Sequence, residues 1–232
     1  MSVQTRPGAT TGPLALVGGA EWREGADFDA ELLERSGSDE VVVLPTAAAY
    51  ERPERAVEWA TRWFASLGGR VRPLMVLRHE DALGAEAAKV VSEARFLYLG
   101  GGSPLHLRSV LKASPLFDAL AAAWHGGAVV AGSSAGAMVL CDPMVDPRGG
   151  AFTVGLGLVE QMAVVPHHEP GGGRLLWRTL ELAPPGIAVA GIPERTALLR
   201  EPGGTWRASG AHVEAVSVYL DGELAGLEAL PG

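Results

Sequence analysis

The sequence predicts an α/β fold built on a largely parallel sheet that helices cover on both faces, with a β-hairpin near the C-terminus. Two observations support this prediction. Short, wholly apolar runs alternate with amphipathic stretches of helical period, a pattern typical of parallel strands buried on both faces. Most of these runs also end in glycine or proline, which is where such strands turn into loops.

The first 140 residues carry the clearest alternation. The apolar runs predict strands at residues 14–17, 41–44, 71–77, 96–99 and 128–131. Helical patterns lie between them, at residues 27–35, 50–67, 81–93 and 104–124, the last broken near Ser114-Pro115. After residue 152 the pattern is less regular, and it predicts strands at 158–165, 187–192 and 196–199, a helix at 173–182 and an antiparallel hairpin at 204–224.

Length and composition limit the domain organisation. The chain has 232 residues, of which 47% are hydrophobic, and we expect residues 14–232 to form a single domain with a sizeable core. Residues 1–13 are polar and rich in glycine and threonine, so a flexible N-terminal segment is expected there. A formal net charge of −8 provides no basic surface for nucleic acid.

Cysteine usage and hydropathy limit the cofactors and the location. Cys141 is the only cysteine, which excludes a disulfide within the chain and a thiolate metal cluster. No stretch is long enough to span a membrane, and the N-terminus lacks the layout of a secretion signal. We therefore expect a cytoplasmic protein without metal or organic cofactor, whose partner is a small substrate rather than nucleic acid or membrane. A homodimer is left open.

The most informative motif is Gly-Ser-Ser-Ala-Gly at 132–136, which follows a predicted strand and precedes helix-compatible residues. A serine on a sharp strand-to-helix turn exposes its hydroxyl beside the free N–H groups that open the helix. Small flanking residues leave room for a substrate carbonyl. Because Gly-x-Ser-x-Gly arises readily by chance in a glycine-rich chain, Ser134 is a convincing nucleophile only if a base and an acid lie near it.

The base would be a histidine. His167 and His168 follow an apolar run and Pro166, at a strand end where the loops of a parallel sheet form sites. Neighbouring residues leaving a strand point in opposite directions, so at most one of the pair faces Ser134. The other histidines, for which surface or capping roles suffice, are His79, His106, His125 and His212.

A third group should orient the imidazole and stabilise its cation. Glu194, in Gly-Ile-Pro-Glu-Arg-Thr at 191–196, lies at another predicted strand end. Asp142 and Asp146, shortly after the serine motif, are rivals. A solvated carboxylate is the alternative for each of them, and Glu194 could simply pair with Arg195.

The loop Leu-Gly-Gly-Gly-Ser-Pro at 99–104 also joins a predicted strand to a predicted helix. Ser103 suits a helix N-cap and Pro104 a first helical position. Glycines here expose N–H groups that could bind a phosphate, or form half of an oxyanion hole completed by the N–H of Ala135. A plain tight turn is the third interpretation. Neither nucleotide-binding glycine motif follows a strand, which disfavours nucleotide binding.

Together these segments resemble the S51 serine peptidases, a family that includes dipeptidase E and cyanophycinase. The resemblance runs from near residue 14 to near residue 200. It rests on Leu-Val-Gly-Gly-Ala-Glu at 16–21, the glycine loop at 99–103, the serine motif at 132–137, Gly-Leu-Gly-Leu at 155–158 leading to Pro166-His167, and Gly-Ile-Pro-Glu-Arg-Thr-Ala-Leu at 191–198. The order Ser, His, Glu differs from the Ser, acid, His order of α/β-hydrolases.

The resemblance implies a three-layer α/β/α sandwich like that of the class I glutamine amidotransferases, which carry cysteine where this chain has serine. It implies Ser134 as nucleophile, His167 as base and Glu194 as orienting acid, with His168 ranked second as base. Serine at this position implies amide hydrolysis through an acyl-enzyme. The implied oxyanion donors are Gly101 or Gly102 together with Ala135.

The substrate is where the chain departs from both branches. The cyanophycinase pattern has an acidic residue and a glutamine before the histidine, where this chain has Val165 and Pro166. The dipeptidase E pattern has a longer, arginine-bearing loop after the histidine, whereas the loop here is short and leads to Arg174. A guanidinium can hold a carboxylate with two hydrogen bonds, so Arg174 is the candidate for that role, with Arg178 as competitor. The expected substrate-binding residues are Ser103, His168 and Arg174.

The sequence therefore predicts a serine peptidase that hydrolyses short peptides as a dipeptidase E-like exopeptidase, with action at aspartyl residues as one option. One alternative is a cyanophycinase-like exopeptidase acting on the Asp-Arg polymer. Another is a non-catalytic module that binds a small molecule and has kept the serine motif. A third is a carboxylester hydrolase of the α/β-hydrolase type, which requires an acid between Ser134 and the histidine.

Overall fold

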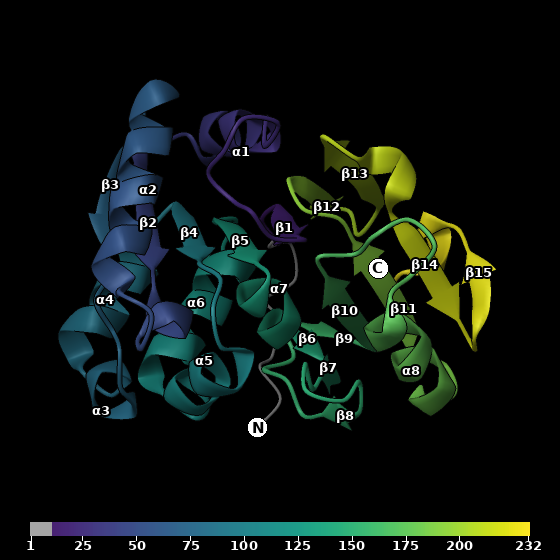
Figure 1. The fold of residues 1–232 in the computed structure, drawn as a ribbon. Helices are drawn as coiled ribbons and strands as arrows, with labels where there is room; N and C mark the ends of the chain where they lie inside the picture. Colours follow the sequence, from purple (N-terminus) through teal and green to yellow (C-terminus); the bar gives the residue numbers. More distant parts are fainter. Residues whose placement is uncertain (1–10) are drawn as a thin grey trace.

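The computed structural model describes residues 11–232 (Figure 1). The expected flexible segment at 1–13 therefore lies mostly outside the described residues. Within it, Gly12 is buried: its N–H donates to the carbonyl of Trp124 at 2.7 Å, and the indole N–H of Trp124 donates to the Gly12 carbonyl at 2.8 Å. The packed body thus begins before the first strand.

A seven-stranded sheet forms the centre of the molecule, in the order β13-β12-β1-β5-β4-β2-β3. The strands from β1 to β5 run parallel, whereas β12 and β13 are antiparallel additions beside β1. The largely parallel sheet predicted from the sequence is confirmed. Its strands are β1 Leu14–Val17, β2 Glu40–Leu44, β3 Arg70–Pro73, β4 Phe96–Leu99, β5 Val129–Ser133, β12 Thr196–Arg200 and β13 Trp206–Gly210.

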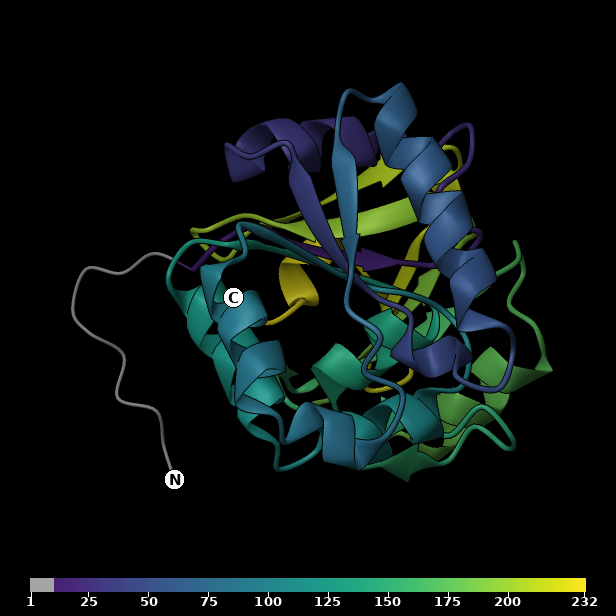
Figure 2. The ribbon, with the colours of Figure 1, turned by 90° about the vertical axis from the view of Figure 1, so that its left-hand side faces the viewer.

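Helices cover both faces of this sheet, because alternate residues of its strands feed two separate hydrophobic cores. In β2, Val41 and Val43 belong to one core, while Val42 and Leu44 belong to the other. Figure 2 shows the two helical layers on either side of the sheet. On one face lie α1 Phe28–Ser36 and α2 Pro53–Ser66, and on the other α3 His79–Ala82, α4 Ala85–Glu93, α5 Pro104–Leu111, α6 Pro115–His125 and α7 Ala135–Leu140. The predicted fold class, a three-layer α/β/α sandwich, is confirmed.

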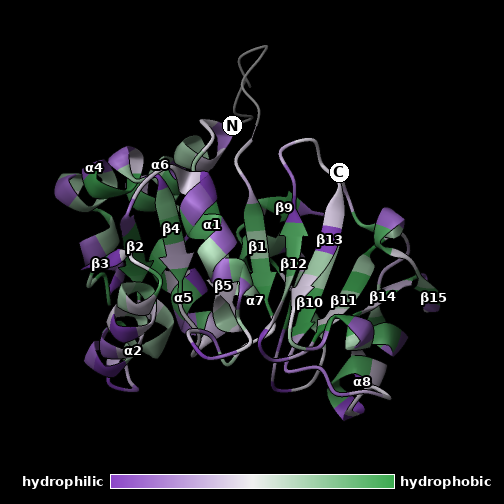
Figure 3. Ribbon diagram, turned by 90° about the horizontal axis from the view of Figure 1, so that it is seen from above, coloured by the Kyte–Doolittle hydropathy of each residue, from purple (hydrophilic) through white to green (hydrophobic). Residues whose placement is uncertain are grey.

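A second, four-stranded sheet, ordered β10-β11-β14-β15, lies beside the first (Figure 1). Helix α8 Arg174–Leu182 connects its two parallel strands, β10 and β11. In Figure 3 the strands of both sheets are mostly the green of hydrophobic residues, while α2 and α8 carry purple, hydrophilic turns. The strands are β10 Met162–Pro166, β11 Ala188–Ile192, β14 Ser217–Leu220 and β15 Glu223–Ala225, and two short ladders precede them, β6 Cys141–Asp142 with β9 Val159–Glu160 and β7 Met144–Val145 with β8 Phe152–Thr153.

Two elements of the second half differ from their prediction. The alternating segment 204–224 is not one hairpin, because β13 pairs with β12 in the main sheet and β14 pairs with β11 and β15 in the second sheet. The C-terminal hairpin is therefore β14–β15. The strand expected at 158–165 is interrupted at Gln161, whose φ of 60° redirects the chain from the short β6–β9 ladder into the second sheet.

Candidate active site

Ser134 occupies the sharp turn between β5 and α7, where parallel strands of the main sheet end. Its φ of 48° and ψ of −105° lie outside the regions that L-residues favour. Such a conformation costs roughly 1–3 kcal/mol and persists only where the surroundings hold it. Here Ser133 is fully buried, and the Ser134 N–H donates to the carbonyl of Val17 at 2.9 Å. The turn lifts the Ser134 side chain out of the buried strand, as a nucleophile requires.

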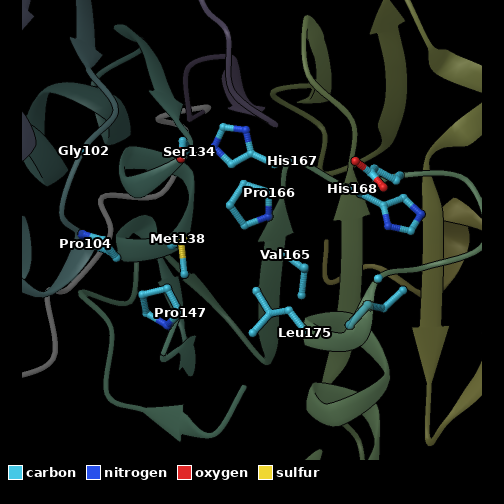
Figure 4. A pocket seen from close by; sticks show the side chains of 13 residues that line it. Gly102, Pro104, Ser134, Met138, Pro147, Val165, Pro166, His167, His168 and Leu175 are labelled. Atoms are coloured by element: carbon cyan, nitrogen blue, oxygen red, sulfur yellow. Dashed lines mark hydrogen bonds between the residues drawn. The ribbon is translucent and has the colours of Figure 1, made fainter. Parts of the chain in front are cut away.

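Ser134, His167 and Glu194 form a continuous hydrogen-bonded chain. His167 follows β10, and its Nε2 lies 2.8 Å from the Ser134 hydroxyl oxygen (Figure 4). Its Nδ1 lies 2.9 Å from a carboxylate oxygen of Glu194, which follows β11. The carboxylate can only accept, so Nδ1–H donates to it, and Nε2 is left to accept the serine proton. The side chains of His167 and Glu194 are about half exposed, at 50% and 54%.

The two rival acids lie elsewhere. Asp142 accepts a hydrogen bond from the N–H of Gly155 at 2.8 Å, within the connection between the sheets. Asp146 binds the guanidinium and backbone N–H of Arg148, which lower its pKa to about 2. Neither carboxylate contacts His167, so the geometry favours Glu194 as the orienting acid.

The end of strand β1 binds the backbone of the three segments that carry Ser134, His167 and Glu194. Three consecutive carbonyls at the end of β1 accept hydrogen bonds from segments far apart in the sequence. The pairs are Val17 with the N–H of Ser134 at 2.9 Å, Gly18 with that of His167 at 2.7 Å, and Gly19 with that of Arg195, the neighbour of Glu194, at 2.8 Å. This strand end, which we call the carbonyl anchor (residues 17–19), joins the two sheets at the site.

The glycines of the carbonyl anchor are required by close approach. A Cβ on Gly18 would overlap the carbonyl oxygens of Ile192 and Pro193. A Cβ on Gly19, whose φ is 119°, would overlap the imidazole of His167. Both sites exclude larger residues because the second sheet and the histidine ring lie directly against the strand end.

The glycine loop leaves one N–H for an oxyanion. The N–H of Gly100 donates to Leu44 and that of Ser103 to Ala47, while the N–H of Gly101 donates to Glu21 at 2.9 Å. Among the described residues no acceptor is found for the N–H of Gly102, which lines the cavity around Ser134. With the first N–H of α7, on Ala135, it can form the oxyanion hole, and the loop has little capacity left for a phosphate.

Glu21 ends the motif at 16–21, yet sequence reasoning assigns it no role. One of its carboxylate oxygens accepts the Gly101 N–H, and the other accepts the Ser133 hydroxyl at 2.7 Å. Glu21 therefore ties the glycine loop to the strand that carries Ser134. It acts on the position of the glycine loop relative to Ser134 and makes no hydrogen bond to the Ser134 hydroxyl.

Of the three expected substrate-binding residues, only His168 lines a cavity that contains Ser134. The Ser103 hydroxyl caps α5 by accepting the N–H of His106 at 3.3 Å. The His168 ring is buried against Gly191, and its Nε2 lies 2.6 Å from the hydroxyl of Ser217. Arg174 lines a separate cavity together with Arg148 and Arg178, not the cavities that contain Ser134.

Other reactive chemistry is sparse in the described part of the chain. Residues 11–232 contain no group of three or more His, Cys, Asp or Glu placed to hold a metal ion. Burial raises the pKa of the Cys141 thiol far above its usual range, which makes it a poor nucleophile. None of the helices among residues 11–232 is both long and apolar enough to cross a membrane.

Comparison with known proteins agrees with this geometry. The family model for peptidase family S51 matches residues 14–205. The chain belongs to peptidase family S51. This confirms the family predicted from the sequence motifs, and the match includes every residue of the hydrogen-bonded chain.

Relatives of this S51 chain include two curated cyanophycinases, from Synechococcus elongatus and Thermosynechococcus vestitus. Each is 27% identical over 212 residues, covering 86% of this chain and 66% of the relative, so this chain spans slightly less than two thirds of their length. A solved peptidase from an acI-B1 actinobacterium matches with a TM-score of 0.75 and 28% identity, over 94% of this chain and 98% of that one. A candidate peptidase E from Listeria monocytogenes shares the fold, with a TM-score of 0.65 and 18% identity over 87% of this chain and 99% of that one.

Proposed function

We propose that this S51 protein is a serine peptidase that hydrolyses short peptides through a Ser134–His167–Glu194 triad. The observation that carries the proposal is the hydrogen-bonded chain, with contacts of 2.8 and 2.9 Å, on a strained strand-to-helix turn. Two free N–H groups beside the serine add support, since acyl transfer needs donors for a developing oxyanion.

The proposed reaction proceeds in two steps. His167 Nε2 takes the proton of the Ser134 hydroxyl as its oxygen attacks the peptide carbonyl, and the N–H groups of Gly102 and Ala135 stabilise the oxyanion. Collapse of the tetrahedral intermediate breaks the C–N bond, and the amine leaves with the proton from His167. Water, deprotonated by the same imidazole, then releases the acyl group and regenerates Ser134. Glu194 holds the ring and stabilises its cation throughout.

A dipeptidase E-like exopeptidase is the form of this activity that we favour. The spaces on either side of Ser134 are small, with volumes of about 380 and 490 Å³, and each is bounded by a helix or loop. Both volumes lie in the range of sites that bind small ligands, which fits a short peptide.

A cyanophycinase-like exopeptidase is the second candidate, favoured by the identity of 27% to two cyanophycinases. The two residues before His167 disfavour a cyanophycinase-like activity. Val165 and Pro166 are buried and apolar, so they offer no polar side chain to a substrate of alternating acidic and basic groups.

The decisive experiment combines active-site labelling with hydrolysis. We expect a fluorophosphonate probe to label Ser134, as located by mass spectrometry, and dipeptides to be hydrolysed. Ser134→Ala should abolish both, while Ser109→Ala, an exposed serine on α5, should change neither. Incubation with the Asp-Arg polymer separates the two candidates, since release of Asp-Arg dipeptides would favour the second. Failure to label Ser134 would reject both and favour a binding module.

A further inference from the structure

Two cavities meet at Ser134, and they differ in chemistry. Both are lined by Gly102, Ser134 and His167. The first, which we call the apolar pocket, extends toward β10 and α8 and is lined by Met138, Pro147, Val165 and Leu175 (Figure 4). The second, which we call the arginine pocket, extends toward α2 and is lined by Arg23, Arg52 and Arg55. A substrate bound at Ser134 has access to both.

The apolar pocket is suited to a hydrophobic side chain. Of the described residues that line it, only Glu169 carries a formal charge at neutral pH if the histidines are neutral, and its side chain is exposed. Its volume of about 380 Å³ accommodates a branched aliphatic or aromatic side chain. A carboxylate placed there would lose its hydration without meeting a cationic partner, which is costly.

The arginines that line the arginine pocket have no carboxylate partner among the described residues. None of its three arginines forms an ion pair with a carboxylate of residues 11–232. Three carboxylates also line the pocket, and two of them accept hydrogen bonds from other groups: Glu21 binds Gly101 and Ser133, and Glu194 binds His167. The lining is therefore balanced in formal charge, but the guanidinium groups of its three arginines are bound to none of these carboxylates and their donors are open to an external anion.

Trp59 holds two of these arginines in place. The guanidinium carbon of Arg55 lies 4.6 Å from the centre of a Trp59 ring, and that of Arg23 lies 5.9 Å from it. Arg23 lies in the loop after β1 and Arg55 in the first turn of α2. The Trp59 ring therefore makes cation–π contacts with arginines from two separate segments. This arrangement lowers the entropy lost when the guanidinium groups bind an anion.

We propose that the substrate carries a carboxylate that binds in the arginine pocket and an apolar side chain that fills the apolar pocket, with the scissile bond at Ser134 between them. This inference rests on the proposed peptidase function and names its substrate class. The carboxylate is either the C-terminus of a short peptide or an Asp or Glu side chain, because a guanidinium binds both with the same paired hydrogen bonds.

Matched peptides distinguish the two sources of the carboxylate. Leucyl-alanine and its amide differ only in the terminal carboxylate. Leucyl-aspartate amide and leucyl-asparagine amide, and the reversed pair aspartyl-leucine amide and asparaginyl-leucine amide, differ only in a side-chain carboxylate. We expect one of these comparisons to show a kcat/KM roughly 10- to 100-fold higher for the acid than for the amide. A ratio of that size corresponds to one hydrogen-bonded contact between charged groups.

Variants connect that preference to the two pockets. The double variant Arg52→Gln/Arg55→Gln should lose the preference for the acid, whereas Arg62→Gln, exposed on the same helix and outside the cavity, should retain it. Leu175→Trp should narrow the apolar pocket and lower kcat/KM for leucyl-alanine more than for glycyl-alanine. Circular dichroism and fluorophosphonate labelling check that each variant is folded.

A binding measurement separates this inference from the proposed function. In the Ser134→Ala background, calorimetric titration with the same peptides measures binding without turnover. Tighter binding of the acid, lost in the double arginine variant, supports the inference even if the wild type hydrolyses nothing, which would contradict only the proposed function. Equal binding and cleavage of acid and neutral peptides, or a preference that survives in the double variant, would overturn the inference while leaving a peptidase that labels at Ser134 intact.

Discussion

The two sheets contribute to the active site in different ways. The main sheet supplies Ser134 from a backbone turn whose preceding residue is fully buried. The second sheet supplies His167, and Glu194 lies in the connection from β11 of the second sheet to β12 of the main sheet. The side chains of both are half exposed, and their backbone positions depend on contacts with the end of β1. Ser134 is thus positioned by the strand that carries it, whereas His167 and Glu194 are positioned at the boundary between the two sheets.

This difference shows where the site is most sensitive. His167 and Arg195 both have positive φ, at 53° and 55°, and both donate their N–H to the carbonyl anchor. The strained backbone of His167 is held from outside its own sheet, and that of Arg195 lies in the connection between the two sheets. Changes at the boundary should therefore affect catalysis as strongly as changes near the serine, and the following variants test this from the largest expected effect to the smallest.

The largest effect is expected from the acid of the second sheet. Glu194→Gln should lower kcat by about 10²–10⁴-fold with little change in KM, because a neutral amide does not stabilise the imidazolium and can favour the wrong tautomer. The rate of fluorophosphonate labelling of Ser134 gives a readout that needs no known substrate. Asp146→Asn is the matched control, since Asp146 pairs with Arg148. If Asp146→Asn lost activity and Glu194→Gln did not, Asp146 rather than Glu194 would be the orienting acid.

A substitution in the carbonyl anchor should come next. Gly19→Ala places a methyl group against the His167 ring, and displacing that ring should slow labelling by roughly 10- to 100-fold. Gly68→Ala is the control, since Gly68 has a φ of 83° but an added Cβ meets nothing within 4 Å. It should cost about 1–2 kcal/mol of stability in thermal unfolding without slowing the reaction. Equal labelling rates in both variants would mean that the boundary does not position the base.

Glu21 tests the main-sheet side of the comparison. Glu21→Ala removes the acceptor for the Gly101 N–H and the Ser133 hydroxyl, and we expect kcat to fall by about tenfold with KM nearly unchanged. Glu21→Gln retains one carbonyl oxygen and should recover most of the rate, which a role in bulk folding alone would not predict. Glu24→Ala, exposed in the same loop, should have no effect.

The smallest effect is on stability and concerns the buried histidine of the second sheet. Burial lowers the pKa of His168 below its ordinary value of 6.5, against a weaker opposing effect of Glu169. Below about pH 6.5 the unfolded chain therefore binds a proton that the folded chain does not, and stability falls as the pH drops. The thermal unfolding midpoint should therefore be lower at pH 5 than at pH 7.5, and His168→Gln should reduce that difference by the contribution of His168. An unchanged difference would show that His168 does not contribute.

The first half of the fold was predictable because its strands and helices are local patterns joined by short loops. The second half was not, since the strand partners of 204–224 are set by distant contacts, such as the pairing of Leu14 with Arg200 that brings β12 beside β1. Alternation along a strand indicates which residues share a face and leaves the neighbouring strand undetermined.

The candidate site was predictable to the extent that it lies in motifs. Ser134, His167 and Glu194 were named from the sequence, and the structure brings them into contact. The arginines lining the cavity were not found, because Arg52 and Arg55 precede the serine by some 80 residues in a helix that reads as ordinary surface. Closeness to His167 in the chain predicts Arg174 as a substrate contact, whereas the structure places Arg174, at the start of α8, in another cavity.

The carbonyl anchor has a consequence for redesign. Residues 17–19 bind the backbone of the segments that carry Ser134, His167 and Glu194. Two of the segments that line the pockets, 51–59 and 169–175, make none of these contacts with residues 17–19. Those two segments could be exchanged between related enzymes while Ser134, His167 and Glu194 keep their positions. A change of substrate preference would then require replacing only the start of α2 and the loop before α8.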